Sequence, residues 1–374
     1  MLLRDKVILI VSPESWGGNY VSKHHYALEL AKRKNKVFFL NPPQAGVGYD
    51  CEEISDGLIT INYKSRLRGL NRLPFSFRKV IQSYHAKKLI KIINLNIDIL
   101  WCFEPYRFQY LSVFGSPLTI YHPVDIHKSK VENDITKDAH VILGSSDRIL
   151  SRFSDVDKPK LKVNHGLGDH FLNPKKLSKS FIVNSEKLNV GLIGNLHYSF
   201  LDCETLTDII QNNYELDFYF IGPIGTSNLS SSLRNEEFVN FLNSVSNAFL
   251  LGSKPSEDLP SYLGEFDMFL ICYTGDKNVD EMANPHKIIE YLSTGKPIVS
   301  HYIDEYREHN DIICMANDNK ALPGLFSLVS KNLRNYNSSE LIDKRKNIAK
   351  DNTYSLQIDR IEKFLFNLFN DNAF

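Results

Sequence analysis

The sequence lacks an excess of either charge. Its 44 Lys and Arg residues are balanced by 44 Asp and Glu residues, so the formal net charge at pH 7 is zero. A protein that attracts nucleic acid through its overall field needs a basic excess. We therefore expect no nucleic acid among its partners.

Long apolar runs are also missing. The first run, residues 7–11, follows three charged residues and is far too short for the core of a signal peptide or for a membrane span. No later stretch approaches the roughly 20 apolar residues that a spanning helix needs. The sequence predicts a cytoplasmic protein that does not cross a bilayer.

Cysteine is sparse and scattered. The sequence has no C-x-x-C pair and no His/Cys cluster at zinc-ligand spacing. The five cysteines are Cys51, Cys102, Cys203, Cys272 and Cys314. This pattern indicates a reducing compartment and no structural metal site.

The chain of 374 residues is long enough for two domains of roughly 150 to 200 residues each. An apolar run at 6–11, a helical segment around Tyr26 and Leu30, and a second run at 37–40 predict a βαβ unit. Gly17 and Gly18 lie between the first strand and the helix, where paired glycines let the backbone approach a ligand closely. A glycine pair is also common in ordinary loops.

The same alternation of strand and loop continues along the chain. Further strands are predicted at 97–103, 118–121, 141–144, 162–164, 189–193, 218–221, 248–251, 268–272, 297–299 and 312–315. Their short, nearly continuous apolar character is typical of parallel strands that are buried on both faces. The polar segment 172–186, which is rich in lysine, predicts an interdomain linker.

One candidate for chemistry follows the strand at 118–121. His122 comes directly after this strand, and Asp125 follows three residues later. Residues at the carboxyl ends of parallel strands face the ligand crevice of an open α/β sheet. A lone histidine in this position is more often structural, so both interpretations stay open.

The segment NPHKIIEYLSTGKPIVS, residues 284–300, combines a helix start, a helix stop and a strand. Asn284 is predicted as the N-cap and Pro285 as the first helical residue, while Gly295 ends the helix. Lys287 in the first turn, together with the helix dipole, forms a plausible cradle for a diphosphate. Glu290 lies on the same face, where it can accept hydrogen bonds from ribose hydroxyls. The alternative is an exposed Lys287–Glu290 pair worth ~0.3 kcal/mol.

This segment resembles the K-x-x-E-Y-L-x-x-G-K-P-V-V motif of glycosyltransferases with the GT-B fold, in particular the bacterial family 4 type that builds surface polysaccharides. The resemblance implies that Glu290 binds the donor ribose and that Asn284, Pro285, His286 and Lys287 bind the diphosphate. Many family 4 enzymes carry a second glutamate eight residues earlier, where this chain has Met282. The resemblance therefore does not supply the usual contact to the transferred sugar.

Other landmarks are similar to the same family. The Trp-Gly-Gly order that includes Gly17 and Gly18, and the HGLGD segment at 165–169, resemble the start and the exit of the first domain. His122 matches a residue near the transferred sugar, with Asp125 as the neighbour best able to orient it. Further donor-binding residues implied by the resemblance are Gly194, Asn195, His197, Gly252, Ser253 and Lys254. Many relatives place arginine and lysine beside the residue equivalent to Gly194, whereas this chain offers His197.

We therefore expect an α/β protein with the GT-B fold, in which two Rossmann-like doubly wound domains face an interdomain cleft. The expected domains are 1–172 on the acceptor side, 173–354 for the donor, and a terminal helix at 355–374 that returns to the first domain. No Asp-x-Asp pair ends a predicted strand, so we expect metal-independent binding of the donor and no cofactor.

The expected activity is transfer of a sugar from a nucleotide diphosphate sugar, such as a UDP-sugar, to a saccharide or polyprenyl-linked acceptor. The family likeness implies retention of the anomeric configuration. Two alternatives stay open: a nucleotide-sugar epimerase of the same fold, and an inactive subunit that only binds nucleotide sugar.

The stretch from Lys64 to Lys91 carries nine basic residues and no acidic one, with apolar residues between them. Such a segment can lie on an anionic membrane, with its basic side chains on lipid phosphates. A solvated loop and helix is the alternative. We expect peripheral contact with the inner face of the cell membrane through this stretch.

Overall fold

The computed structural model describes residues 2–17, 19–46, 48–64, 73–127, 131–175, 183–225, 234–274 and 284–371. Backbone contacts divide the chain into two compact units. Unit 1 comprises residues 1–164 and 354–374, and unit 2 comprises residues 165–353. The domain boundaries expected from the sequence, after residues 172 and 354, lie slightly further along the chain.

The described part of unit 1 forms an eight-stranded sheet in the order β3-β4-β2-β1-β5-β6-β7-β8. All neighbouring strands are parallel except β3 and β4, which pair as an antiparallel hairpin at one edge. The strands are β1 Val7–Val11, β2 Lys36–Leu40, β3 Gly48–Ser55, β4 Leu58–Lys64, β5 Ile99–Cys102, β6 Leu118–Tyr121, β7 Val141–Gly144 and β8 Lys160–Lys162.

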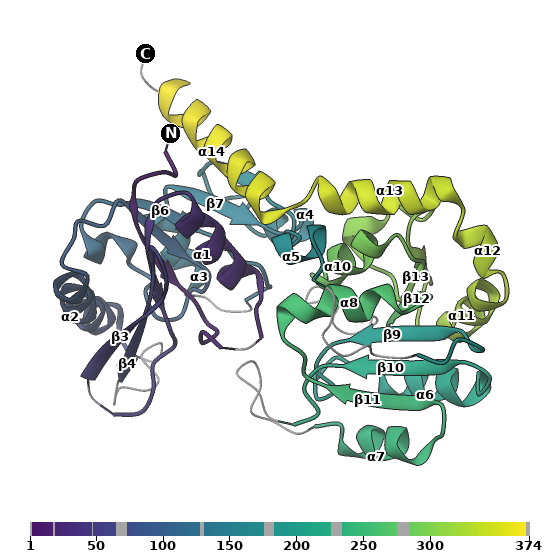
Figure 1. Cartoon of the computed structure of the whole chain (residues 1–374). Helices are drawn as coiled ribbons and strands as arrows, with labels where there is room; N and C mark the ends of the chain where they lie inside the picture. Colours follow the sequence, from purple (N-terminus) through teal and green to yellow (C-terminus); the bar gives the residue numbers. More distant parts are fainter. Residues whose placement is uncertain are drawn as a thin grey trace. The chain divides into compact units, whose positions relative to one another are not determined.

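Helices cover both faces of this sheet because its strands present apolar side chains in both directions. Along β1, Ile8 and Ile10 pack in one core cluster, while Leu9 and Val11 pack in the other. The helices are α1 Ser22–Lys32, α2 Phe75–Ile93, α3 Glu132–Asp138, α4 Asp147–Ser151 and α14 Tyr354–Asp371, with a 3-10 turn at Leu111–Phe114. Figure 1 shows α14, at the end of the chain, beside α1 from its beginning, and Arg33 pairs with Asp359 at 2.7 Å.

The described part of unit 2 forms a six-stranded, wholly parallel sheet in the order β11-β10-β9-β12-β13-β14. The strands are β9 Asn189–Ile193, β10 Asp217–Ile221, β11 Ala248–Gly252, β12 Met268–Ile271, β13 Ile298–Ser300 and β14 Cys314–Met315. The helices are α5 Asp169–Leu172, α6 Cys203–Asn212, α7 Glu236–Ser244, α8 Leu259–Gly264, α10 Lys287–Thr294, α11 Leu322–Lys331, α12 Leu333–Tyr336 and α13 Ser339–Lys350, with 3-10 turns at Ser256–Asp258 and Asp304–Tyr306.

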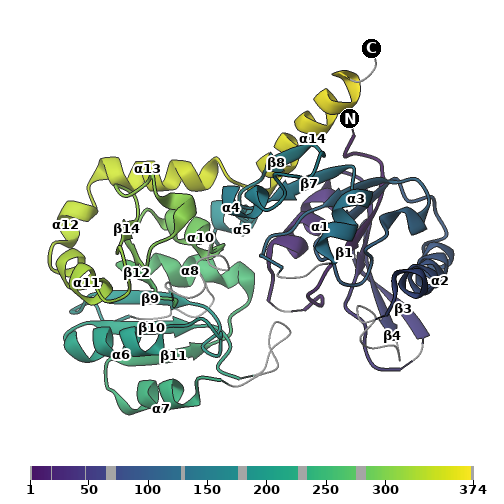
Figure 2. The ribbon, with the colours of Figure 1, turned by 180° about the vertical axis from the view of Figure 1, so that it is seen from behind.

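Two separate apolar clusters pack against this second sheet. One contains buried residues of α6, α7 and α11, and the other contains buried residues of α8 and α10. Seen from behind in Figure 2, the helices of unit 2 again lie on both faces of its sheet. Two doubly wound parallel α/β domains are therefore confirmed.

The strand orders locate the switch point of each sheet. In unit 2 the chain passes from β9 outward to β10 and β11, and then returns to the other side of β9 as β12. The loops that follow β9 and β12 therefore lead away in opposite directions. In open α/β sheets, ligands bind at the carboxyl ends of the strands where this happens. In unit 1 the same reasoning selects the ends of β1 and β5.

All five cysteines are free thiols. Among the described residues, no helix is both long and apolar enough to cross a bilayer. The same residues contain no group of three or more His, Cys, Asp and Glu side chains that could hold a metal ion.

Candidate functional site

Helix α10 begins later than the sequence predicts. His286, not Asn284, is the N-cap, and it already has helical dihedral angles. Pro285 lies in a preceding turn, in which its carbonyl accepts from the Ile288 N–H at 3.1 Å. The predicted end is correct, because Gly295 adopts the left-handed conformation (φ 78°) that caps a helix C-terminus.

The first turn of α10 has the features of an anion site. Its N-cap residue, His286, makes no side-chain cap hydrogen bond, and the backbone N–H groups of a helix start carry partial positive charge. Lys287 adds a full charge there, with its side chain 17% exposed. His286 is held beside His165, with ring centroids 6.0 Å apart.

Glu290 lies one turn further along α10 and is largely buried. Its Oε2 atom lies 3.7 Å from Lys287 Nζ, and the structure gives that oxygen no hydrogen bond. Burial raises the pKa of Glu290, and Lys287 lowers it in part. A buried carboxylate oxygen without a hydrogen bond is costly, and a ligand hydroxyl would satisfy it. The exposed surface pair considered from the sequence is therefore not what the structure contains.

Tyr291 fixes α10 against the sheet, a role that the sequence reasoning missed. Its hydroxyl accepts the Ile193 N–H at 2.7 Å, and its ring stacks on Phe269 at 4.2 Å. Ile193 is the last residue of β9, so this bond ties α10 to the switch point of unit 2. The tyrosine of the E-Y-L motif was the available signal.

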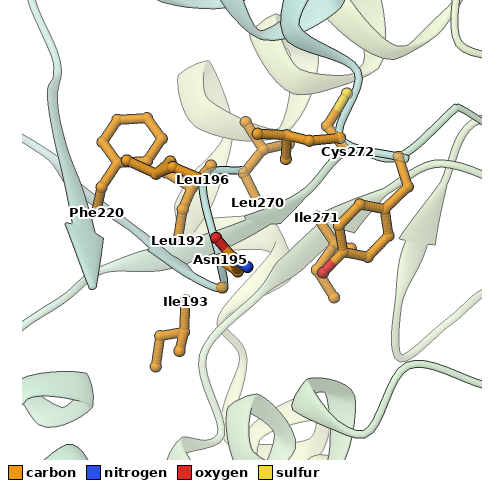
Figure 3. A pocket seen from close by; sticks show the side chains of 11 residues that line it. Leu192, Ile193, Asn195, Leu196, Phe220, Leu270, Ile271 and Cys272 are labelled. Carbon is orange, nitrogen blue, oxygen red and sulfur yellow. The ribbon is translucent and has the colours of Figure 1, made fainter. Parts of the chain in front are cut away.

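A small cavity lies at this switch point. It has a volume of about 30 Å³, which suits one or two water molecules and not a nucleotide. Figure 3 shows apolar side chains of β9, β10 and β12 gathered around it, with the Asn195 amide among them. Tyr273, which follows β12, also lines it. A ligand as large as a nucleotide therefore does not fit within this cavity.

Gly194 and Asn195 form the loop that leaves β9. The Gly194 N–H donates to the Ile221 carbonyl at 2.9 Å, which extends the pairing of β9 with β10. Asn195 Oδ1 accepts the His197 N–H at 2.9 Å and closes a tight turn. These backbone groups lie at the carboxyl end of β9, as the sequence predicts.

His197 is held by hydrogen bonds at both of its ring nitrogens. Its Nε2 donates to the Ile224 carbonyl at 2.7 Å, and its Nδ1 accepts the Asn235 N–H at 3.2 Å. These two bonds place a ring proton on Nε2, and the side chain is only 4% exposed. Two bonds from one imidazole tie the loop after β9 to the loop after β10 and to the start of α7. His197 therefore fixes the arrangement of the loops at the carboxyl ends of β9 and β10.

The residues after β11 have separate environments. Gly252 ends the strand with φ 70°, and its carbonyl accepts the Gly222 N–H at 3.0 Å. Ser253 is exposed. Lys254 places its ammonium group over the Tyr262 ring, 5.3 Å from the centroid. Lys287 therefore lies beside the buried Glu290 carboxylate, whereas Lys254 contacts the Tyr262 ring.

Gly222 is required by the close approach of two strand ends. Its φ is 149°, and a Cβ atom there would lie 1.9 Å from the Gly194 carbonyl oxygen. We expect Gly222→Ala to lower the free energy of unfolding by about 2 kcal/mol or more, measured by urea denaturation, and to displace the Gly194 loop. Gly225→Ala is the matched control, since no atom lies within 4 Å of its Cβ position. Equal stability of the two variants would contradict this reading.

In unit 1, His122 is buried among aromatic rings at the carboxyl end of β6. It is 1% exposed and lies 4.9 Å from the Phe103 ring and 5.3 Å from the Tyr26 ring. Its Nδ1 accepts from Trp101 Nε1 at 3.3 Å. In the neutral ring the proton is therefore on Nε2.

Asp125 does not orient His122 as expected. Its carboxylate lies 3.9 Å from Lys23 Nζ, and its side chain is 66% exposed. Trp101 occupies the imidazole nitrogen that a carboxylate would have bound. The physical reason is the difference in burial: Asp125 faces solvent, whereas the His122 N–H still bonds to the Cys102 carbonyl of the neighbouring strand and its side chain is buried.

Gly17 lies in the loop after β1, and Gly18 lies outside the described residues. His24 fixes this loop as His197 fixes the loop after β9. Its Nε2 donates to the Ser15 carbonyl at 3.1 Å, and its Nδ1 accepts the Val21 N–H at 3.1 Å. Burial lowers the pKa of His24 to about 4, which keeps the ring neutral. Asn41 completes the support by accepting the Trp16 N–H at 2.7 Å.

Comparisons with known proteins find similar structures but no match by sequence. No protein-family model and no curated protein sequence matches the chain. Among solved structures, a sucrose-phosphate synthase from Thermosynechococcus elongatus is similar with a TM-score of 0.72 at 13% identity, and the match covers 97% of this chain and 100% of that one.

Two further structures cover nearly the whole chain. An α,α-trehalose 6-phosphate synthase from Burkholderia multivorans matches with a TM-score of 0.70 at 10% identity over 99% of this chain and 100% of that one. HepE from Anabaena, solved in complex with UDP, matches with a TM-score of 0.66 at 12% identity over 97% of this chain and 100% of that one. The chain therefore has the GT-B fold that these glycosyltransferases share.

Proposed function

We propose that this protein is a glycosyltransferase that moves a sugar from a UDP-sugar to a hydroxyl of a saccharide or lipid-linked saccharide acceptor. The observation that carries the proposal is the start of α10 in unit 2. There the backbone N–H groups of a helix start and Lys287 offer positive charge, and the buried Glu290 Oε2 has no hydrogen bond among the described residues. A nucleoside diphosphate brings the two complementary groups, an anion and vicinal hydroxyls.

Structures with the same fold support the choice of donor. HepE was solved with UDP and, in a second structure, with UDP and glucose. The names of the similar structures are those of synthases and transferases, so they do not favour the epimerase alternative. We further propose that the helix start and Lys287 hold the diphosphate without a metal ion, and that the family 4 likeness extends to retention of configuration.

A single assay distinguishes the proposed activity from its alternatives. The protein is incubated with a panel of nucleotide sugars, with and without a lipid-linked saccharide, in the presence of EDTA. We expect release of UDP that depends on the acceptor and is unchanged by EDTA. Release of an epimer without acceptor would identify an epimerase. Binding of UDP-sugar without any product would identify an inactive subunit. Loss of activity with EDTA would overturn metal independence alone.

A further inference from the structure

Helix α2 of unit 1 packs one face against the core and leaves the other face exposed. Gln82, Ala86, Leu89 and Ile93 are buried and recur at the spacing of one helix face. The opposite side of the helix is turned to solvent, and we call it the outer face of α2. It consists of Phe77, Val80, Tyr84, Lys87, Lys88 and Lys91.

The first half of the outer face is apolar and strongly exposed. Phe77 is 64% exposed, Val80 68% and Tyr84 55%. Their spacing of three and four residues places them in one stripe along the helix. Single exposed apolar residues are ordinary, but three large ones in a continuous stripe mark an interaction surface. Figures 1 and 2 both show α2 at the periphery of its unit.

The second half of the outer face is basic and lacks acidic partners. Between Phe75 and Ile93 the sequence has no Asp or Glu. Among the described residues, Lys87, Lys88 and Lys91 form no ion pair, whereas Arg78 on the flank of the helix pairs with Asp134 at 3.4 Å. Lys88 instead lies over the Tyr84 ring, 4.4 Å from its centroid. The charge of the face is thus available to an external anionic surface.

We propose that the outer face of α2 docks the protein on an anionic lipid membrane. The apolar stripe enters the boundary between headgroups and acyl chains, while the three lysines meet lipid phosphates. The Tyr84 ring, apolar with a polar tip, suits that boundary. A single convex helix face with clustered positive charge fits a flat anionic surface, whereas a protein partner would need a complementary groove.

This inference is narrower than the sequence expectation and independent of the proposed activity. The expected membrane segment ran from Lys64 to Lys91, and its residues 65–72 lie outside those that the structure describes. The outer face of α2 lies entirely within the helical part of that stretch. A protein without transferase activity would bind vesicles in the same way.

Sedimentation of the full chain with vesicles tests the proposal. We expect binding to vesicles that contain phosphatidylglycerol at low salt, weak binding to phosphatidylcholine vesicles, and at least about ten-fold weaker binding when salt screens the lysines. The triple variant Phe77→Ser, Val80→Ser, Tyr84→Ser should bind about ten-fold more weakly at every salt concentration. The triple variant Lys87→Gln, Lys88→Gln, Lys91→Gln should lose most of the salt dependence.

A matched variant separates a local surface from total charge. Lys320, Lys331 and Lys350 are exposed lysines of unit 2, and changing all three to glutamine removes the same charge. We expect this variant to bind like the wild type, and circular dichroism should show all variants folded. Failure of the wild type to bind anionic vesicles at low salt would overturn the proposal. The proposal would also be overturned if the unit 2 lysine variant weakened vesicle binding as much as the variant at Lys87, Lys88 and Lys91. Capture of an acidic protein through the same face, without vesicle binding, would identify a protein partner instead.

Discussion

Replacing Glu290 by alanine is expected to weaken the binding of UDP by a factor of about 30 to 1,000, measured by isothermal titration calorimetry. Two hydrogen bonds from ribose hydroxyls to a carboxylate are together worth about 2 to 4 kcal/mol. The carboxylate is already desolvated, with its Oε2 atom 3.7 Å from Lys287 Nζ and without a hydrogen bond. The ligand therefore gains the bonds without the full cost of removing water from the acceptor.

The same substitution should leave stability almost unchanged. Burial raises the pKa of Glu290, which means that its charged form is disfavoured in the folded protein. Removing that charge should not lower the unfolding temperature. Glu290→Gln keeps the shape but loses the charge and should bind UDP with intermediate affinity. Glu265→Ala, at an exposed position of the same unit, is the control. If Glu290→Ala bound UDP with unchanged affinity, the Lys287–Glu290 pair would be only a structural contact of α10.

Much of the fold was predictable because buried parallel strands have a simple sequence pattern. The strands at 118–121, 141–144 and 189–193 were placed correctly, and most others differ by one or two residues at an end. The hairpin of β3 and β4 was missed. Six of the eight residues of β3 are exposed, so it lacks the apolar alternation that identifies a strand. Asp56-Gly57, with Gly57 at φ 76°, was the available turn signal.

The candidate site was predictable only where local sequence decides the structure. Gly295 caps α10 because the left-handed conformation favours glycine, and this follows from the sequence alone. The role of His197 depends on Ile224 and Asn235, which are distant in the sequence and reach the ring only after both loops have folded. The helix start was misplaced for a different, local reason. The bond from the Ile288 N–H to the Pro285 carbonyl makes a turn before the helix proper.

The contact between Trp101 and His122 was predictable only in part. Strand β5 pairs with β6 so that Trp101 faces Ile120 and Cys102 faces Tyr121. This register brings the residue after β6 to the end of β5, where the indole can reach the imidazole. Adjacent strands could be inferred from the order of elements, but their register could not. The nearer residue in sequence, Asp125, was therefore chosen in place of Trp101.

His122→Ala is expected to lower kcat by a factor of about 100 to 1,000 and to leave the affinity for UDP nearly unchanged. A hydrogen bond that strengthens as the sugar becomes oxocarbenium-like stabilises the transition state more than bound donor, so its loss appears in kcat and not in KM. The bond from Trp101 Nε1 to His122 Nδ1 supports this role, because it assigns the ring proton to Nε2 as a donor. Steady-state kinetics and calorimetry together measure the two effects.

Trp101→Phe distinguishes this role from a purely structural one. It removes the Nε1–H donor but keeps an aromatic ring in the stack with Phe103 and His122. If His122 acts through a fixed tautomer, the variant should lose turnover, show a shifted pH profile and bind UDP normally. If His122 only fills the core, Trp101→Phe should lower the unfolding temperature while kcat and the pH profile of the folded enzyme stay unchanged. A His122→Ala enzyme that lost donor affinity but kept its turnover at saturation would show that the catalytic assignment is wrong.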